Sequence, residues 1–259
     1  MQAAELFDLT GRVALVTGAS SGLGRQFARA LAENGAAVVL VARRAARIEA
    51  LKAEIENRGG KAVAIAADVN NQADMVAAFD AAEKAFGTVT ILVNNAGVAQ
   101  KPMRATEVPA QEWRRVLATD LDAVFYWAQE AARRMLAAQA KGAIVNIASV
   151  LGFGVAKGTA AYAVSKAAVV QITKALALEL AFKGVRVNAI APGWFVTEIN
   201  DDYLNSEAGA AIKRDIPMGR FGNEGDLDGA LLLLVSDAGA YITGATVVVD
   251  GGQVVQIKG

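Results

Sequence analysis

The fold is decided by residues 12–24, which read RVALVTGASSGLG. The first six residues form a short apolar run, typical of a strand that is buried on both faces. A glycine-rich turn and a helical pattern at residues 23–34 follow. Glycines let a backbone approach a pyrophosphate closely, and the N-terminus of the next helix directs free amides toward it. Because the spacing differs from the general G-x-G-x-x-G pattern, a tight connection without a ligand is the alternative interpretation.

The rest of the chain repeats this alternation of strand and helix. Apolar runs predict strands at residues 12–17, 37–42, 61–66, 91–94, 143–148, 186–190 and 246–250. Helical patterns predict helices at residues 23–34, 45–57, 72–86, 110–140, 159–183 and 226–234. Glycines are expected just past helix ends at Gly35, Gly59, Gly87 and Gly142. We therefore expect an α/β fold, a doubly wound parallel sheet of about seven strands, in a single domain over residues 1–259.

The composition excludes several kinds of site and partner. Lys and Arg number 26, Asp and Glu also 26, and neither His nor Cys occurs. Balanced charge predicts no nucleic-acid partner. The missing residue types exclude a disulfide framework, a cysteine nucleophile, a histidine base and a Cys/His metal site, and we expect no metal. No signal-peptide pattern occurs and no apolar run approaches the roughly 18 residues of a membrane span, so we expect a cytoplasmic protein without a membrane partner.

Further motifs follow the later strands in order. They are Asn94–Gly97 (NNAG), Ser149, a Tyr162-x-x-x-Lys166 pair, Pro192-Gly193 with Thr197, and Asp250-Gly251-Gly252. In open parallel sheets, ligands bind at the carboxyl ends of the strands. Together with T-G-x-x-x-G-x-G from Thr17 to Gly24, this set resembles the classical short-chain dehydrogenase/reductase family over nearly the whole chain. The resemblance implies a Rossmann-type fold with its strands ordered 3-2-1-4-5-6-7, a nicotinamide dinucleotide cofactor and an enzyme that moves a hydride.

The resemblance also implies roles by position. The implied catalytic residues are Ser149, Tyr162, Lys166 and Asp120. The phosphate loop would use Gly18, Ser20, Ser21, Gly22 and Leu23. The adenine and its ribose would meet Asp68, Val69, Asn94, Ala96 and Gly97. The nicotinamide and its ribose would meet Tyr162, Lys166, Pro192, Gly193, Val196 and Thr197.

Tyr162 and Lys166 can carry acid/base chemistry. They are four residues apart in a predicted helix, so they share one face. A free phenol ionises near about pH 10 and is a poor base at neutral pH. A cation within about 5 Å favours tyrosinate by roughly 3 kcal/mol at an effective dielectric near 20. Ser149 can bind the substrate oxygen. An ordinary surface pair is the alternative for Tyr162 and Lys166, and the accompanying motifs favour catalysis.

Asp120 departs from the family pattern. At its position the family usually has an asparagine, which supports a kinked turn whose carbonyl holds a water on the lysine. Asp120 has the same shape but lacks the amide donor. Two interpretations stay open: a tolerated isostere, or a retuned proton relay in which an ionised Asp120 opposes Lys166 and makes tyrosinate less favourable.

The end of the second predicted strand bears on the choice of cofactor. An acidic residue there binds the ribose 2′-hydroxyl of NAD, but this chain has Ala42 followed by Arg43. Arginine is a permanently charged, bidentate partner for phosphate. We therefore expect NADP, with NAD as second choice and with Arg43 on the 2′-phosphate. The alternative is that Arg43 and Arg44 simply begin a solvated helix.

Three functions stay open at this point. The first is an NADP(H)-dependent reductase of a hydrophobic carbonyl, such as a 3-oxoacyl thioester. The second is an NAD-dependent dehydrogenase of a secondary alcohol, sugar or steroid, and the third is a catalytically weak dinucleotide-binding scaffold. The expected pocket lining is apolar: Val98, Val150, Leu151, Val155, Trp194, Phe195 and Tyr203. Residues 194–223 are expected to form a mobile substrate flap. The family resemblance, together with apolar helix faces within 123–140 and 159–183, predicts a homotetramer.

Overall fold

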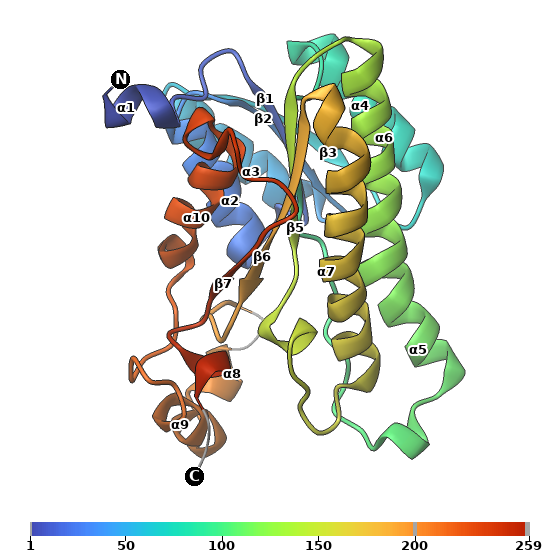
Figure 1. Cartoon of the computed structure of the whole chain (residues 1–259), viewed down its shortest axis with the longest axis vertical. Coiled ribbons are helices and arrows are strands. Elements are labelled where there is room, and N and C mark those ends of the chain that lie inside the picture. The colour runs from blue at the N-terminus through green and yellow to red at the C-terminus, as the bar shows by residue number, and fades with distance from the viewer. Residues whose placement is uncertain (1, 199–200, 257–259) are drawn as a thin grey trace.

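The computed structural model describes residues 2–198 and 201–256, and within them it shows one parallel sheet (Figure 1). The strands follow the order β3-β2-β1-β4-β5-β6-β7, and each neighbouring pair is parallel. Their bounds are β1 (Val13–Thr17), β2 (Ala37–Ala42), β3 (Lys61–Ala66), β4 (Ile91–Asn94), β5 (Gly142–Ile147), β6 (Val185–Pro192) and β7 (Thr246–Val249). The predicted fold class and strand order are confirmed.

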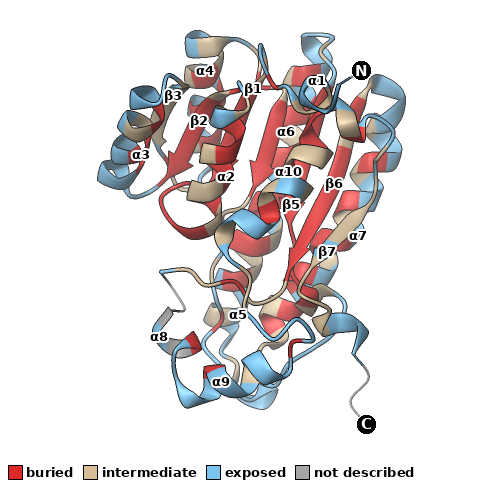
Figure 2. Cartoon of the chain, turned by 90° about the vertical axis from the view of Figure 1, so that its left-hand side faces the viewer, coloured by how far each residue is buried: buried red, intermediate tan, exposed pale blue. Residues whose placement is uncertain are grey.

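Helices cover both faces of the sheet (Figure 1). Their bounds are α1 (Ala3–Phe7), α2 (Gly22–Glu33), α3 (Ala45–Asn57), α4 (Gln72–Phe86), α5 (Ala110–Leu117), α6 (Ala123–Ala137), α7 (Ala160–Leu180), α8 (Asp201–Leu204), α9 (Glu207–Arg214) and α10 (Asp228–Val235). On one face α2, α3 and α10 pack against the sheet, and on the other α4, α6 and α7 do so. The strands between them are buried, while the outer helix faces are exposed (Figure 2). This two-sided cover explains why β1 is buried along its whole length.

The predicted helix at residues 110–140 is wrong as a single continuous helix. The chain forms α5, then a π-helical turn at Ala118–Asp122, and then α6. A π turn holds one residue more than an α turn, and the hydrophobic period of the sequence does not reveal such an insertion. The consequence is local but important, because Asp120 is turned inward and is 0% exposed.

Two other helices begin or end at residues different from those predicted. The helix expected at residues 159–183 ends as α7 at Leu180 and continues as a 3-10 turn, Ala181–Lys183, closed by Gly184 at a φ of 79°. The helix expected at residues 226–234 begins with the 3-10 turn Glu224–Leu227, and only α10 is α-helical. Both 3-10 turns are short pieces at helix ends, where such turns are frequent.

Gly142 does not follow a helix end as predicted. It is the first residue of β5, while Gln139 takes the left-handed position after α6, with a φ of 53°. A Cβ at Gly142 would meet the sulfur of Met135 and would lie 3.0 Å from the carbonyl oxygen of Thr90. Close packing of α6 on the sheet therefore requires this glycine. Gly35, Gly59 and Gly87 do follow helices and have positive φ, as expected.

The predicted flap at residues 194–223 contains α8 and α9 and lies at the carboxyl end of the sheet (Figure 2). Its two ends are joined by a bridge between Phe195 and Gly222. The Phe195 ring is 5% exposed and belongs to the core that includes α2 and α10. A Cβ at Gly222 would collide with that ring. The base of the flap is therefore packed, and motion of the remainder stays a prediction.

A chain of buried polar side chains ties the sheet to α6 and α7. The Asn94 amide donates to the Asn146 side-chain oxygen at 3.0 Å and to the Val124 carbonyl at 3.0 Å. The Asn146 amide donates to the Thr173 hydroxyl at 3.0 Å, which donates to the Val169 carbonyl at 2.8 Å. Buried polar groups that are fully paired hold a core in one arrangement.

Replacing the central residue of this chain should destabilise the protein. Asn146→Ala leaves a donor and an acceptor on its neighbours without partners, and we expect the free energy of unfolding to fall by about 2–4 kcal/mol. Denaturant unfolding followed by circular dichroism measures the change. Asn57→Ala, at the exposed end of α3, is the matched control and should stay within about 0.5 kcal/mol. Equal stability of the two variants would contradict the structural role of Asn146.

Candidate active site

The turn between β1 and α2 leaves no room for side chains at its glycines. Gly18 and Gly22 have positive φ values of 70° and 51°. A Cβ at Gly18 would lie 2.8 Å from the Asn95 amide nitrogen and 2.9 Å from the Ala96 Cα. The backbone of this turn is therefore bare and leads directly into the N-terminus of α2. Such a cradle fits the pyrophosphate of a dinucleotide.

Thr17 and Asn95 fasten the turn to the segment after β4. The Thr17 hydroxyl accepts the backbone N–H of Asn95 at 3.0 Å and that of Ala96 at 3.1 Å. The Asn95 amide donates to the carbonyl of Thr17 at 2.9 Å and to that of Gly18 at 3.4 Å. The sequence analysis did not assign Asn95 a role, although it stands inside the NNAG motif. Its neighbour Asn94 is turned into the core, 3% exposed.

Lys166 joins α7 to the carboxyl end of β5, the strand that Ser149 follows. The Lys166 ammonium is 4% exposed and donates to the Ile147 carbonyl at 3.0 Å, while lying 5.5 Å from the centre of the Tyr162 ring. Ser149 follows Ile147 by two residues, and its hydroxyl accepts the Leu151 N–H at 3.2 Å. The structure thus brings together three of the predicted catalytic residues on one strand end and one helix.

Gln100 is a further residue of this site that sequence reasoning missed. It is 6% exposed, and its side-chain oxygen accepts the N–H of Ala161 at 2.8 Å and that of Tyr162 at 3.2 Å. Its amide donates to the Gly158 carbonyl at 3.0 Å. Gln100 therefore caps α7, the helix that carries Tyr162, from the loop after β4. No local signal could reveal this cap because the partners are 61 residues apart in sequence.

Asp120 lies beside Lys166, inside the π-helical turn. One carboxylate oxygen accepts the Val98 N–H at 2.7 Å, and the other is buried without a hydrogen-bond partner among the described residues. A Cβ at Gly97 would lie 3.4 Å from Asp120 Oδ1 and 3.8 Å from Lys166 Nζ, so both groups border Gly97. Burial raises the pKa of the Asp120 carboxyl, and the charge of Lys166 opposes that rise. The structure therefore favours the neutral acid more than an ordinary aspartate would.

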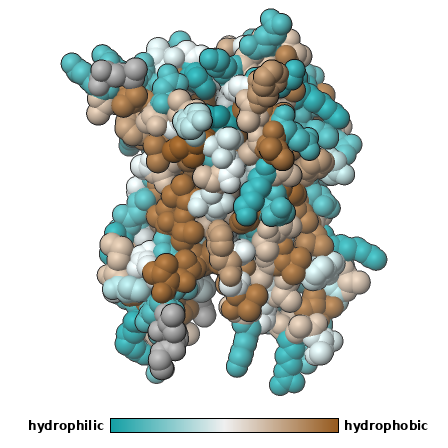
Figure 3. Space-filling model, in the orientation of Figure 1, coloured by the Kyte–Doolittle hydropathy of each residue, from teal (hydrophilic) through white to brown (hydrophobic). Residues whose placement is uncertain are grey.

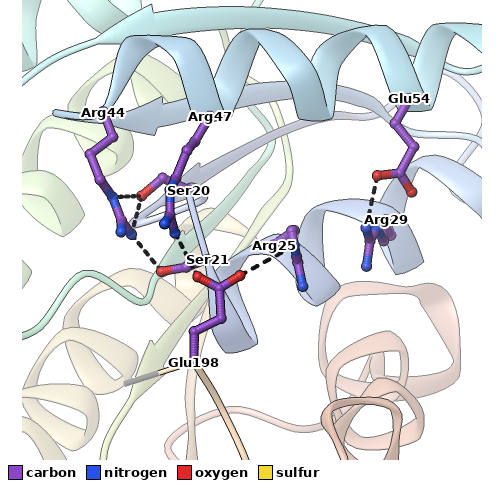
Figure 4. A network of polar contacts seen from close by, with 8 residues as sticks. All are labelled: Ser20, Ser21, Arg25, Arg29, Arg44, Arg47, Glu54 and Glu198. Carbon is purple, nitrogen blue, oxygen red and sulfur yellow. Dashed lines mark hydrogen bonds and ion pairs between the residues drawn. The ribbon is translucent and has the colours of Figure 1, made fainter. Parts of the chain in front are cut away.

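The end of β2 places Arg44, rather than Arg43, on the phosphate loop. Arg44 donates to the Ser20 hydroxyl at 2.8 and 3.1 Å and to the Ser21 hydroxyl at 2.5 Å (Figure 4). Arg43, the residue that the sequence pointed to, is exposed next to it. The last residue of β2 is Ala42, so the strand itself supplies no acidic side chain at this end. A guanidinium fork on the loop suits a phosphate group.

The other predicted cofactor contacts lie along the same edge of the sheet. Asp68 accepts the N–H of Asn70 at 3.0 Å, and the Val69 carbonyl accepts from Trp127 at 3.0 Å, so both shape the turn after β3. Leu23 packs against the core below the phosphate loop. After β6, the chain passes over this loop, because the Thr197 methyl lies 3.3 Å from the position of a Cβ at Gly22.

Pro192 and Gly193 end β6 close to β7. The Gly193 N–H donates to the Val249 carbonyl at 3.0 Å, and a Cβ on Gly193 would lie 2.7 Å from that of Asp250. The Val196 N–H donates to the Gly222 carbonyl at 3.1 Å. The segment that would meet the nicotinamide is therefore held by backbone contacts to β7 and to the end of the flap.

The predicted apolar pocket is only partly assembled. Leu151 and Val155 line a cavity of about 1000 Å³ beside the first turns of α7, together with Met103, Phe153, Ala163 and Val164. Ser149, Tyr162 and Lys166 do not line it, so this cavity is not the catalytic cleft. Phe195 was expected in the pocket but is buried in the core, because its ring fills the space beside Gly222. The Tyr203 side chain lies outside the described part of the chain.

Residues 2–198 and 201–256 contain no group of three or more Asp or Glu residues placed to hold a metal ion. None of their helices has the length and hydropathy needed to cross a bilayer.

The buried Asp120 should make stability depend on pH in a defined direction. Because its pKa is raised on folding, the native chain keeps this proton to higher pH than the unfolded chain, and stability is lost as pH rises through the native pKa. Asp120→Asn removes this titration. We expect the free energy of unfolding of the variant, relative to wild type, to increase as the pH rises above about 4, the ordinary pKa of an aspartate.

Denaturant unfolding at several pH values measures this difference. Asp122→Asn, an exposed change in the same π-helical turn, is the matched control and should follow wild type. If the difference in free energy of unfolding between Asp120→Asn and wild type is constant over the pH range, burial does not raise the pKa of the Asp120 carboxyl.

Comparisons with known proteins agree with this geometry. A family model described as enoyl-(acyl carrier protein) reductase matches residues 18–253. The chain is 41% identical to D-threitol dehydrogenase of Mycolicibacterium smegmatis, covering 96% of this chain and 95% of that protein. It is 40% identical to a 3-oxoacyl-(acyl-carrier-protein) reductase of Staphylococcus aureus, covering 92% and 96%.

Solved structures lead to the same family. A gluconate 5-dehydrogenase from Burkholderia cenocepacia, in complex with NADP and tartrate, superposes with a TM-score of 0.93 at 36% identity, covering 99% of this chain and 100% of that chain. The ordered motifs, the sheet and these matches extend over nearly all of the sequence. The chain belongs to the short-chain dehydrogenase/reductase family and is an NAD(P)-dependent oxidoreductase that acts on alcohols and ketones.

Proposed function

We propose that this enzyme uses NADP(H) to interconvert a ketone and a secondary alcohol, with Tyr162 as its acid/base. The observation that carries the proposal is the buried Lys166 ammonium, which Ile147 holds beside the Tyr162 ring and close to Ser149. When bound, the nicotinamide supplies or accepts the hydride. The bare glycine turn and the Arg44 fork fit a dinucleotide that carries a 2′-phosphate.

The side chains supply the proton and orient the substrate. In reduction, Tyr162 gives its phenolic proton to the carbonyl oxygen as the hydride reaches the carbon, and in oxidation it takes the proton back. Lys166 stabilises the resulting tyrosinate through its nearby positive charge. The Ser149 hydroxyl accepts the Leu151 N–H, so its own hydrogen can be donated to the substrate oxygen. Gln100 holds the turn of α7 from which Tyr162 projects.

The substrate is proposed to be a hydrophobic carbonyl compound or the matching alcohol. Val150 and Leu151 are the two residues after Ser149, Val98 is the residue after Gly97, and all three are apolar. One relative is named for a 3-oxoacyl thioester reaction, which fits this class. Another is named for a sugar alcohol, and this makes a polyol the second candidate.

We also propose a homotetramer in the cytoplasm with a mobile flap at residues 194–223. Large apolar side chains are exposed on the outer sides of α6 and α7: Tyr126 at 42%, Leu136 at 38%, Val164 at 47% and Leu178 at 84%. Figure 3 shows apolar side chains gathered in the middle of the face that carries β7 and α7. Exposed apolar area of this kind favours association.

Tyr162→Phe should remove the transferable proton while keeping the ring. We expect turnover to fall by about two to four decades, with the affinity for the cofactor largely kept. The assay is a screen of ketones and secondary alcohols with each cofactor, followed at the nicotinamide absorbance. Tyr126→Phe, on the exposed side of α6, is the control and should keep full activity. Normal turnover of Tyr162→Phe would refute the mechanism.

Arg44→Ala should weaken NADPH binding and spare NADH. Loss of a charge-assisted contact costs about 1.5–3 kcal/mol. Arg43→Ala tests the residue that the sequence indicated, and the contacts with Ser20 and Ser21 predict the larger loss for Arg44. Fluorescence titration with each cofactor measures the affinities, and Arg133→Ala on α6 is the control. If wild type binds NADH more tightly, or if Arg44→Ala weakens both cofactors equally, NADP is the wrong assignment.

A further inference from the structure

Glu198 reaches from the segment after β6 to two helices on the opposite side of the phosphate loop. One carboxylate oxygen lies 2.6 Å from the Arg47 guanidinium on α3, and the other lies 3.5 Å from the Arg25 guanidinium on α2. Figure 4 shows the carboxylate between these two arginines, with Ser21 of the phosphate loop beside it. The hydrogen bond from Arg47 lowers the pKa of the Glu198 carboxyl, and Arg25 and Arg44 act in the same direction. The group is therefore an anion at neutral pH.

Three arginines and one carboxylate thus gather at the end of β2. Arg25 and Arg47 are neutralised in part by Glu198, whereas Arg44 contacts only the neutral hydroxyls of Ser20 and Ser21 in the network drawn. Among the described residues, no carboxylate lies within 4.0 Å of the Arg44 guanidinium. The neighbouring carboxylate of Glu54 does not pair with Arg44, because it pairs with Arg29 farther along the helices.

We propose that Glu198 is a specificity-determining residue that limits the preference of this enzyme for the cofactor with a 2′-phosphate. The proposal rests on the proposed use of NADP(H) at this site. The carboxylate occupies two of the three guanidinium groups that a phosphate at the end of β2 would attract. It also brings a negative charge close to the place where that phosphate would lie, and like charges in partly screened surroundings repel. NADH lacks this phosphate, so Glu198 acts on it much less.

The contact has a second consequence for the segment that follows β6. Thr197 packs on Gly22 and Glu198 pairs with α2 and α3, so consecutive residues of one segment touch the phosphate loop and the arginines. If Glu198 only anchors this segment, its removal should change the affinity for NADPH and for NADH equally, because both cofactors contain the pyrophosphate. If its charge acts on the 2′-phosphate, the removal should change the affinity for NADPH much more than the affinity for NADH. The two roles are therefore distinguished by comparing NADPH with NADH.

The test is Glu198→Gln, which keeps the shape and a hydrogen-bond acceptor but removes the charge. Wild type and variant are titrated with NADPH and with NADH, and binding is followed by nicotinamide fluorescence, without any substrate. We expect the ratio of the two dissociation constants to shift about tenfold toward NADPH, chiefly through tighter NADPH binding. High salt should reduce this shift, because it screens the charges. Glu207→Gln, an exposed change at the start of α9, is the control and should leave the ratio unchanged.

The outcomes separate this proposal from the proposed function. If wild type prefers NADPH and Glu198→Gln leaves the ratio unchanged, or weakens both cofactors equally, Glu198 is only an anchor and the present proposal is overturned. If wild type binds NADPH no more tightly than NADH while the variant gains the preference, the proposed cofactor is wrong for the natural enzyme and Glu198 is the reason. Thermal unfolding of both variants verifies that each is folded.

Discussion

The Thr17 hydroxyl accepts two backbone N–H groups from the segment after β4, and the rest of the site depends on this contact. It sets the distance between the ends of β1 and β4, and the Asn95 amide closes the same gap from the other side. The approach is so close that a Cβ on Gly18 would collide with Asn95 and Ala96. A bare loop, directed at the N-terminus of α2, is the result. Anion binding at that helix end follows from the backbone alone.

The second constraint is the position of α7, which presents Tyr162 and Lys166. Groups from two other parts of the chain, β5 and the loop after β4, hold this helix. Gln100 caps its first turn, Ile147 accepts from the Lys166 ammonium, and Asn146 donates to Thr173 two turns farther on. These contacts come from β5 and from the loop after β4. They fix the position of α7 relative to the loop after β4, which also contacts the phosphate loop. Catalytic geometry is thereby built on the sheet rather than on the loops around it.

Charge is used in two different surroundings within this site. Asp120 and Lys166 are buried beside Gly97, where desolvation penalises ionised groups and raises the pKa of the Asp120 carboxyl. Arg44, Arg47 and Glu198 lie nearer the solvent, where ion pairs form at little cost and are partly screened. In the proposed function, Lys166 of the buried pair acts on proton transfer, and Arg44 of the outer group recognises an anion. Both lie along the carboxyl edge of the sheet, as expected for an open α/β fold.

The sequence by itself determined the α/β class, the seven strands, the glycine turn and the family, because these depend on local hydrophobic period and on motifs read within a few residues. The strand order followed from the family that the motifs resemble. It also indicated Ser149, Tyr162 and Lys166, which the structure brings together, although their roles stay predictions. The hydrophobic period did not reveal the π turn within residues 110–140, and only the family resemblance indicated a kinked turn at Asp120. Tertiary structure alone decided that Asp120 is buried, that Arg44 rather than Arg43 meets the loop, and that Gln100 caps α7. Each of these is a contact between segments far apart in the chain, and only packing specifies which side chain reaches which partner.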